Sequence, residues 1–341
     1  MEDLLRNIAL ITGGVVGFVA VFLIIYALIN QLPRGIREKL QAVPFIIFAL
    51  IFAIGGLMVS AVRTAIASVL DDTGKKFVGL GNYREIWDQL DSRLAVVNSF
   101  VWVFVGTTVT VAIGLMIARF ADGMRGERIA KTLIFLPVAI SLVGAGITWR
   151  FIYAEKGFSF DAGLLNAVTK AAHLPDSMGG GPDGRNWLLE RGFGGLTPPS
   201  WGPGFNTLLL IVIFIWAQIG IATVVLSAAI KGVPQELLEA AIVDGATSNE
   251  TFFKVTIPYI KGTIATVTSL VALGSLKAFD TVAAATGGRF GTSTIANEFF
   301  VKFFVQDRNG VAAALAMVLF VLCFPIVVWN RRVQRRIEET N

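Results

Sequence analysis

The sequence has little of what catalytic and metal centres are built from. Its 341 residues include one cysteine, Cys323, and one histidine, His173. A single cysteine excludes a disulfide framework within the chain, a CxxC pair and a zinc knuckle. His173 lies in a loop with no sequence neighbour that could complete a triad or a metal site, which favours a solvated loop residue. The sequence therefore predicts no catalytic residue, no metal site and no enzyme.

A phosphate-binding loop is also missing. The signature Gly-x-x-x-x-Gly-Lys-[Ser/Thr] occurs nowhere in the sequence, and the nearest fragment is DDTGKKF at 71–77. That fragment lacks both the first glycine and the hydroxyl residue that would contact phosphate and Mg²⁺. We expect this chain to bind neither ATP nor any other cofactor.

Charged residues are scarce. They make up 16% of the chain, against about 25% in average soluble domains, while hydrophobic residues make up 55%. The net charge of +5 is spread over loops and helix ends and is not gathered with aromatic residues on one face, so it does not indicate nucleic-acid binding. The composition predicts an integral membrane protein.

Long apolar runs predict about seven membrane-spanning helices, because a span needs about 20 mostly apolar residues. The first run follows Glu2 and Asp3, is too long for a signal peptide and has no cleavage site, so we expect it to stay in the mature protein. Another run, 262–276, is short and continues through Lys277 and Asp280 as a broken span. The other runs are 7–33, 41–62, 94–118, 132–149, about 205–230 and 309–330.

Basic residues are concentrated in alternate loops, which predicts the orientation of the chain. The loops that carry them, and that we expect in the cytoplasm together with the C-terminus, are 31–41, 119–131, 231–261 and 331–341. The N-terminus is then external, as are two sizeable loops, 63–93 and 154–204. The second is rich in glycine and proline and reads as a turn-dense surface without a core of its own.

One cytoplasmic segment is polar although long apolar runs flank it. It reads EAAIVDGATSNETFFKVTIP and covers residues 239–258. Gly245 can adopt the positive φ that ends a helix, and Thr247 with Glu250 has the spacing of a capping box that starts another. The segment therefore predicts a helix, a tight turn and a second helix, with Pro258 at the entry to the next span.

The first helix of this segment presents small residues. Ala240 and Ala241 would let a partner surface approach closely, while Glu239 supplies a charge that could orient it. A solvated helix that rests on the lipid headgroups explains the same residues, so the pattern alone leaves both interpretations open.

The segment resembles the EAA loop of importer-type ABC transporter permeases, in which a helix pair docks into a cleft of an ATPase subunit. The matching residues are Glu239-Ala240-Ala241, Gly245 and Val255-x-Ile257-Pro258. The resemblance implies a role in ATPase coupling for Glu239, Ala240, Ala241, Asp244, Gly245 and Pro258.

The resemblance extends over most of the chain, to the sugar-permease branch of the maltose and α-glucoside type. Where relatives often have Gly-Gly-Gly-Pro, this chain reads Gly287-Gly288-Arg289-Phe290. The similar stretches are FVGLGNYREIW at 77–87, NSFVWVFVGTTVTVAIGLMIA at 98–118, LIFLPVAIS at 133–141, GLLN at 163–166, NWL at 186–188, FDTVAAATGG at 279–288 and AAALAMVLFVLCFP at 312–325.

This resemblance implies an all-α integral membrane protein with the type I ABC importer permease fold and about seven transmembrane helices. These form a six-helix core and an N-terminal extra helix. The implied divisions are 1–66 for the extra helix and the first core helix, 67–93 for an external loop, and 94–341 for the permease core with external loop 154–204 and cytoplasmic EAA loop 231–261.

The resemblance also implies the biological setting. The chain would be a multi-pass permease subunit in a prokaryotic inner membrane, importing a sugar such as an α-glucoside or another oligosaccharide by ATP-driven alternating access. Its partners would be two ATPase subunits that hold ATP and Mg²⁺, a second and distinct permease, an extracytoplasmic sugar-binding protein and membrane lipid, but no nucleic acid.

The run near 205–230 contains a candidate sugar contact. Gln218 is an amide among apolar residues, with Phe214 and Trp216 close in sequence. Sugars are recognised by amides that bond their hydroxyls and by aromatic faces that stack on their C–H surface. A hydrogen bond from Gln218 to a neighbouring helix is the alternative.

The broken span supplies the other candidates for a substrate path, since charges within the bilayer are tolerated mostly where they face protein or water. Lys277 and Asp280 would share a helical face and could pair, and Ser275 and Phe279 lie beside them. The alternative is that both charges sit at the external interface, snorkelling or forming a structural ion pair. A secondary transporter with Lys277 and Asp280 as relay groups and a non-transporting scaffold are the competing functions.

Overall fold

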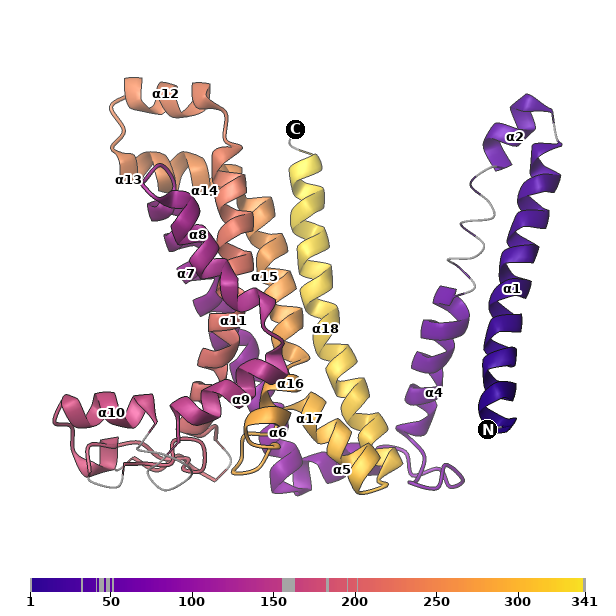
Figure 1. The fold of residues 1–341 in the computed structure, drawn as a ribbon, viewed down its shortest axis with the longest axis horizontal. Helices are drawn as coiled ribbons and strands as arrows, with labels where there is room; N and C mark the ends of the chain where they lie inside the picture. The colour runs from indigo at the N-terminus through magenta and orange to yellow at the C-terminus, as the bar shows by residue number, and fades with distance from the viewer. Residues whose placement is uncertain are drawn as a thin grey trace. The chain divides into compact units, whose positions relative to one another are not determined.

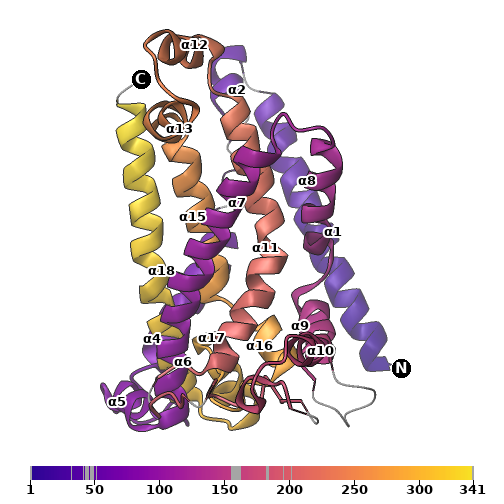
Figure 2. The same cartoon turned by 90° about the vertical axis from the view of Figure 1, so that its left-hand side faces the viewer.

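The computed structural model shows two compact helical units, Met1–Ile66 and Ala67–Asn341 (Figures 1 and 2). Within the described residues, β structure is limited to two isolated bridges, Leu70 with Phe77 and Phe193 with Leu196. The structure describes residues 2–31, 33–40, 42, 46, 50, 52–154, 163–181, 184–194, 196–200 and 202–339.

The first unit contains α1 (Glu2–Asn30), α2 (Arg34–Leu40), the π-helix η1 (Phe52–Met58) and most of α4 (Val59–Ala67). Within α1, Thr12–Asn30 is long and apolar enough to cross a membrane. The predicted span 41–62 falls largely outside the described residues, and its end belongs to a shorter apolar helix, Ala53–Ala67.

The second unit begins with α5 (Gly81–Asp88) and a long helical span. The span consists of α6 (Leu90–Val101), the π-helical turn η2 (Trp102–Gly106) and α7 (Thr107–Ala121), and it is continuous over 32 residues. A Cβ added to Gly114 of α7 would lie 2.8 Å from the Cβ of Ala222. Glycine is therefore needed at this position, because α7 and its neighbour approach closely there.

The predicted span 132–149 is not one straight helix. It is divided into α8 (Glu127–Phe135), the 3₁₀ turn η3 (Leu136–Ala139) and α9 (Leu142–Ile152), and the two parts meet at 100°. Pro137 lies in the turn, and Ser141 caps α9 by accepting a hydrogen bond from the Gly144 amide at 3.0 Å. The expectation of a single helix was wrong because proline and a cap residue end one helix and start another here.

The segment 154–204, predicted as a turn-dense loop, also contains regular structure where it is described. It contains α10 (Leu164–Ala171) and the short turn η4 (Asp176–Met178). Asn166 is buried and its amide joins distant parts of the loop, donating to the Arg185 carbonyl at 2.9 Å and accepting from Trp187 Nε1 at 2.7 Å. Trp187 itself belongs to the main hydrophobic core.

The central helix of the main core is α11 (Phe205–Lys231), which lies between α7 and α8 (Figure 2). Half of its most apolar stretch is buried inside the protein. Leu210, Ile213, Phe214, Ala222 and Leu226 project from it into the main core cluster. Contacts of this kind between membrane helices are stabilised by close van der Waals packing, because lipid tails are as apolar as these side chains.

The remaining elements run between the two ends of the unit. α12 and α13 lie at the end opposite α5 and α10, and the C-terminal end of α18 lies near α12 (Figures 1 and 2). The chain here forms α12 (Gln235–Val243), α13 (Ser248–Thr251), η5 (Phe252–Thr256), α14 (Ile257–Tyr259), α15 (Lys261–Leu276), α16 (Asp280–Ala285), α17 (Ile295–Phe300), η6 (Val301–Val305) and α18 (Asn309–Glu338).

The described residues thus contain four helices that could each cross a membrane, or six if each bent pair is one span. The second bent pair is Ser248–Tyr259 with Lys261–Leu276, which meet at 70°. The predicted break after 276 is present, since α15 ends at Leu276 and α16 begins at Asp280. The protein is therefore an all-helical, multi-pass membrane protein.

Candidate functional site

The polar segment folds as a helix, a turn and a second helix, as predicted. Gly245 follows α12 with φ +82°, and a Cβ there would meet no atom within 4 Å, so backbone conformation and not space requires the glycine. Thr247 and Glu250 form the predicted capping box, with the Thr247 amide donating to Glu250 Oε2 at 3.0 Å. We call residues 235–259, which comprise α12, α13, η5 and α14, the coupling loop.

The first helix of the coupling loop is fully on the surface. α12 has no buried residue, and it exposes apolar side chains, with Val243 87% exposed beside Ile242 and Leu237. Glu239 and Ala240 are exposed as well. Apolar groups gathered on an exposed helix mark an interaction surface. The other predicted coupling residues, Asp244, Gly245 and Pro258, are also exposed, and Ala241 is half-buried.

The second half of the coupling loop is anchored. Phe252, Thr256 and Ile260 are buried, with Phe252 only 9% exposed. Pro258 lies in α14, which follows η5 directly and ends one residue later at Tyr259. The chain then turns by 70° into α15. The loop thus combines the exposed helix α12 with a partly buried second half that continues into α15.

Two predicted substrate-path residues lie together inside the core. A Cβ on Gly106 would lie 3.4 Å from Ser275 Oγ and 3.6 Å from Phe214 Cδ1, so η2, α11 and α15 meet at this glycine. Phe214 and Ser275 are both buried, and Ser275 Oγ donates to the Val271 carbonyl at 3.0 Å. In this conformation neither side chain has surface that a sugar could contact.

The other two candidates on α11 are half-buried. Trp216 packs edge-on against Trp149, with ring centroids 5.7 Å apart. The side-chain amide of Gln218 makes no hydrogen bond to any residue that the structure describes. The alternative of a hydrogen bond from this amide to a neighbouring helix is therefore not seen among the described residues. Within the described residues, the amide of Gln218 and the indole N–H of Trp216 are therefore the polar groups on α11, among the predicted contacts, that make no hydrogen bond.

Lys277 and Asp280 do not pair, which corrects the prediction that they share a helical face. The helix ends at Leu276 and the next begins at Asp280, so the intervening residues are not helical. Both charges are exposed, and within the described residues no ion pair joins them. Phe279 is half-buried, and its ring lies 5.0 Å from that of Phe300.

Sequence reasoning missed a buried charge pair on the segment that follows. Glu298 and Lys302 are 5% and 6% exposed, with Nζ and Oε1 3.6 Å apart. Ser92 Oγ donates to Glu298 Oε1 at 3.0 Å, and Lys302 Nζ donates to Gln89 Oε1 at 2.6 Å. The signal that could have found the pair is its spacing of four residues within an aromatic run.

More hydrogen bonds join α6 to the same segment. Asn98 Nδ2 donates to the carbonyls of Gly291 and Ser293, both at 2.8 Å, and Ser99 Oγ accepts from the Ile295 amide at 2.9 Å. These bonds fix the chain before α17 against α6. We call this set the α6–α17 seam, and its residues are Gln89, Ser92, Asn98, Ser99, Gly291, Ser293, Ile295, Glu298 and Lys302.

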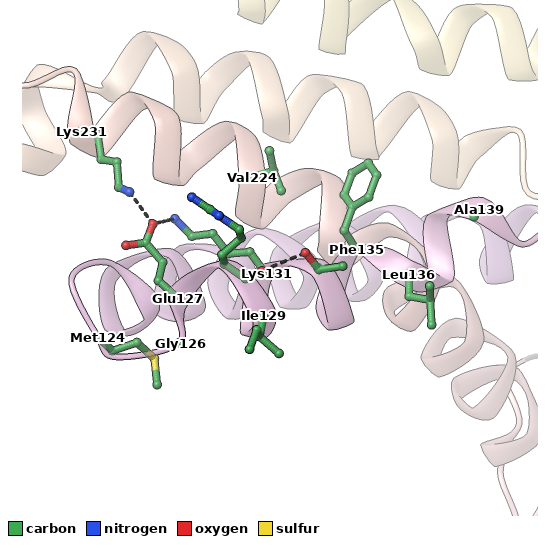
Figure 3. A pocket seen from close by; sticks show the side chains of 12 residues that line it. Met124, Gly126, Glu127, Ile129, Lys131, Phe135, Leu136, Ala139, Val224 and Lys231 are labelled. Atoms are coloured by element: carbon green, nitrogen blue, oxygen red, sulfur yellow. Dashed lines mark hydrogen bonds and ion pairs between the residues drawn. The ribbon is translucent and has the colours of Figure 1, made fainter.

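A groove of about 1060 Å³ lies beside α8 and α11, near the coupling loop (Figure 3). Its charged end contains Glu127, which accepts from Lys131 Nζ at 2.7 Å and is also ion-paired with Lys231. The pair with Lys231 connects the first turn of α8 to the last turn of α11. The apolar part of the groove is lined by Ile129, Phe135, Leu136, Ala139 and Val224.

Comparison with known proteins shows that this chain is similar to membrane subunits of transport systems. Residues 40–339 match the family described as binding-protein-dependent transport system inner membrane component. The chain is 37% identical over 304 residues to the alpha-glucoside transport system permease protein AglF of Rhizobium meliloti, covering 89% of this chain and 83% of that protein. It is 36% identical over 285 residues to the osmoprotective compounds uptake permease protein GgtC of Synechocystis sp., covering 83% of this chain and 95% of that protein.

A solved structure shows the same fold. It is the crystal structure of a bacterial alginate ABC transporter in complex with an alginate pentasaccharide-bound periplasmic protein. One of its chains superposes with a TM-score of 0.70 at 19% sequence identity, covering 89% of this chain and 97% of that chain. Together, the family match over residues 40–339 and the identity to the alpha-glucoside permease show that this chain belongs to the binding-protein-dependent ABC permeases of the carbohydrate-transport branch.

Proposed function

We propose that this chain is one membrane half of an importer for an α-glucoside or a related oligosaccharide, powered by ATP hydrolysis in separate subunits. The observation that carries the proposal is the coupling loop. It is an exposed, capped helix pair with apolar residues on its surface, and it continues into α15, which reaches the predicted substrate path.

The coupling step follows from the shape of this loop. A short exposed helix such as α12 can seat in a cleft of an ATPase subunit, and the anchored base around Phe252 can pass its movement to α15. When two ATPase subunits close on ATP, the loops of two permeases would be drawn together and the spans would change from inward-open to outward-open. Glu239, Asp244 and Gly245 would then form the contact surface.

The partners and the orientation are part of the same proposal. The structural neighbour was solved with a periplasmic protein that carries an oligosaccharide, which supports a binding protein for this system. The coupling loop and the end of α18 lie at one end of the unit, and α5 and α10 lie at the other (Figure 1). This arrangement supports a cytoplasmic coupling loop and C-terminus, with loop 154–204 facing the binding protein and a second, distinct permease beside this one.

The substrate class rests on the relatives. Two of them are named for α-glucosides and for osmoprotective compounds, so both classes belong in the test. Within this chain Gln218 and Trp216 offer an amide and an aromatic ring of the kind that sugars bind, and Phe214 and Ser275 would join them only after the core between η2 and α15 opens.

The test is reconstitution of the complete transporter in lipid vesicles, with its ATPase, sister permease and binding protein. We expect uptake of an α-glucoside that requires ATP, and ATP hydrolysis that the loaded binding protein stimulates. Uptake that persists without ATP and collapses with the proton gradient would contradict the proposal and favour a secondary transporter. Uptake of an osmoprotective compound alone would keep the mechanism and change the substrate.

Alanine substitutions at two glycines can distinguish an effect on coupling from an effect on folding. Gly245 follows α12 and Gly74 lies in the segment between α4 and α5, and both have positive φ and open space around the missing Cβ. α12 and α5 lie at opposite ends of the unit (Figure 1). Substitution by alanine strains both turns by a similar amount, on the order of 1 kcal/mol. We expect Gly245→Ala to lower sugar uptake per ATP several-fold and Gly74→Ala to leave this ratio unchanged.

A further inference from the structure

Arg119 makes an unusual set of contacts at the base of the coupling loop. It lies in the last turn of α7, and its guanidinium carbon is 4.3 Å from the ring centroid of Phe252. The same guanidinium donates a hydrogen bond to Asn249 Oδ1 and lies 5.7 Å from the ring centroid of Phe253. One side chain of α7 therefore holds both α13 and the first turn of η5.

These contacts are the side-chain link between the coupling loop and a different helix. The other side-chain hydrogen bonds of the loop are internal, such as Gln235 to Glu239, Thr247 to Glu250 and Lys254 to Glu250. Within the described residues, no other hydrogen bond, ion pair or cation–π contact joins 235–259 to another transmembrane helix. Among polar and cation–π contacts, Arg119 is thus the side chain that links the loop to a different transmembrane helix, beside the packing of the buried Phe252 and Thr256.

α7 leads from Arg119 directly to the predicted substrate path. About one and a half turns before Arg119, Gly114 brings the backbone of α7 against Ala222 of α11. Farther along, Gly106 at the end of η2 lies against Ser275 and Phe214. The approach at Gly114 is too close for a Cβ, while Gly106 lies within van der Waals range of Ser275 and Phe214. A movement of α7 and η2 would therefore act on the helices that carry these two residues.

We propose that Arg119 is a positioning residue that makes α7 a second route of coupling, parallel to the covalent route through α15. Movement of the coupling loop would pull α7 through the Arg119 contacts and shift η2 against Phe214 and Ser275. The inference rests on the proposed ATP-driven function, and it assigns a transmission role to a residue outside the EAA segment.

The chemistry of this site favours arginine over lysine. A planar guanidinium can stack on the Phe252 ring and donate to Asn249 in the same geometry, whereas an ammonium is a point charge that does not stack. Position 119 also lies at a helix C-terminus, where any cation interacts favourably with the helix dipole. A lysine would therefore keep the favourable charge but lose the stacked contact.

The test uses the complete transporter in vesicles and measures sugar molecules imported per ATP hydrolysed. We expect Arg119→Ala to lower this ratio on the order of tenfold, within the usual range of coupling between sites. Arg119→Lys should lower it roughly two- to fivefold, the cost of the cation–π contact. The matched control is Arg125→Ala, because Arg125 is an exposed arginine in the same loop region that makes no hydrogen bond or ion pair within the described residues.

A double-mutant cycle separates transmission from general damage. Phe252→Leu keeps an apolar side chain at a buried position but removes the aromatic face. We expect the effects of Arg119→Ala and Phe252→Leu on the ratio to be non-additive, because both remove the same contact. If Arg119→Ala reduces complex assembly, the number of sugar molecules imported per ATP is instead measured for Arg119→Lys and Phe252→Leu.

The outcomes distinguish this inference from the proposed function. A wild-type complex without ATP-dependent uptake would overturn the proposed function and this inference with it. A wild-type complex that couples uptake to ATP, together with an unchanged ratio in Arg119→Ala or fully additive effects in the cycle, would overturn the inference alone.

Discussion

The coupling loop and the α6–α17 seam are both rich in polar residues, but they use them in opposite ways. In the coupling loop the polar side chains bond mainly to neighbours a few residues away, and α12 stays exposed. In the seam, Ser92 and Glu298 are 206 residues apart in sequence and both are buried. The loop leaves an apolar helix surface exposed, whereas the seam holds two distant segments of one chain together.

The difference has an energetic basis. Exposed hydrogen bonds compete with water and contribute little, while a buried charge that loses its partner pays its full desolvation cost. A change in the seam should therefore act on folding, and a change on α12 should act on binding. The following predictions, in order of decreasing effect on the free energy of unfolding, test this separation.

The largest effect is expected from the buried charge pair. Lys302→Ala should leave the Glu298 carboxylate without its cation and lower the free energy of unfolding by about 3–5 kcal/mol. Unfolding of the purified protein in detergent measures this loss. The double variant Glu298→Leu with Lys302→Met should recover most of it, since apolar replacements of a buried pair are often neutral. A double variant as unstable as Lys302→Ala would contradict this account of the seam.

A smaller effect is expected from one hydrogen bond of the seam. Ser92→Ala removes the donor to Glu298 Oε1, and hydrogen bonds to charged groups contribute about 1.5–3 kcal/mol. The same unfolding experiment measures it. Thr148→Ala is the control, because that hydroxyl is exposed and donates to a carbonyl four residues earlier in its own helix. Equal losses in the two variants would show that burial does not set the energy of these bonds.

The capping box should contribute less and only locally. Thr247→Ala removes the side chain that accepts from the Glu250 amide, at a cost of about 1 kcal/mol to the start of α13. Amide hydrogen exchange of residues 248–251 should become faster, while exchange in the seam stays the same. Unchanged exchange at 248–251 would mean that contacts other than the cap, such as those of Arg119, hold this turn.

The smallest effect on stability, and a large effect on assembly, is expected on α12. Val243 is 87% exposed, so Val243→Asp should change the free energy of unfolding by less than about 0.5 kcal/mol. It should nevertheless prevent the ATPase subunit from co-purifying. Leu80→Asp, an exposed apolar position at the opposite end of the unit, should leave ATPase co-purification intact. Loss of the ATPase in both variants would remove the distinction between the two ends.

The same contrast explains what the sequence could predict. The turn at Gly245 and the capping box at Thr247 depend on neighbouring residues, and the sequence pattern predicted both. The seam depends on pairs such as Ser92 with Glu298, which only the folded chain brings together. The predicted substrate path is an intermediate case. The sequence placed Phe214 and Ser275 in membrane spans, but it could not predict that both side chains are buried in the core.

Two predictions failed for local reasons that were visible in the sequence. Pro137 and Ser141 break the span predicted at 132–149, and a proline followed by a cap residue is a sufficient signal for such a break. Lys277 and Asp280 were expected on one helical face, but α15 ends at Leu276, one residue before Lys277. Spacing by three residues predicts a shared face only where the helix is continuous.

The central claim is that an ATPase subunit binds α12, and site-specific cross-linking tests it most directly. Cys323 is the single cysteine, so its replacement by serine gives a background in which Val243→Cys is the only thiol in this chain. In the assembled transporter, a cross-linker at position 243 should capture the ATPase subunit, with a yield that changes when ATP is added, whereas Leu80→Cys should not. Capture of lipid alone at position 243, or equal capture of the ATPase from position 80, would contradict the account.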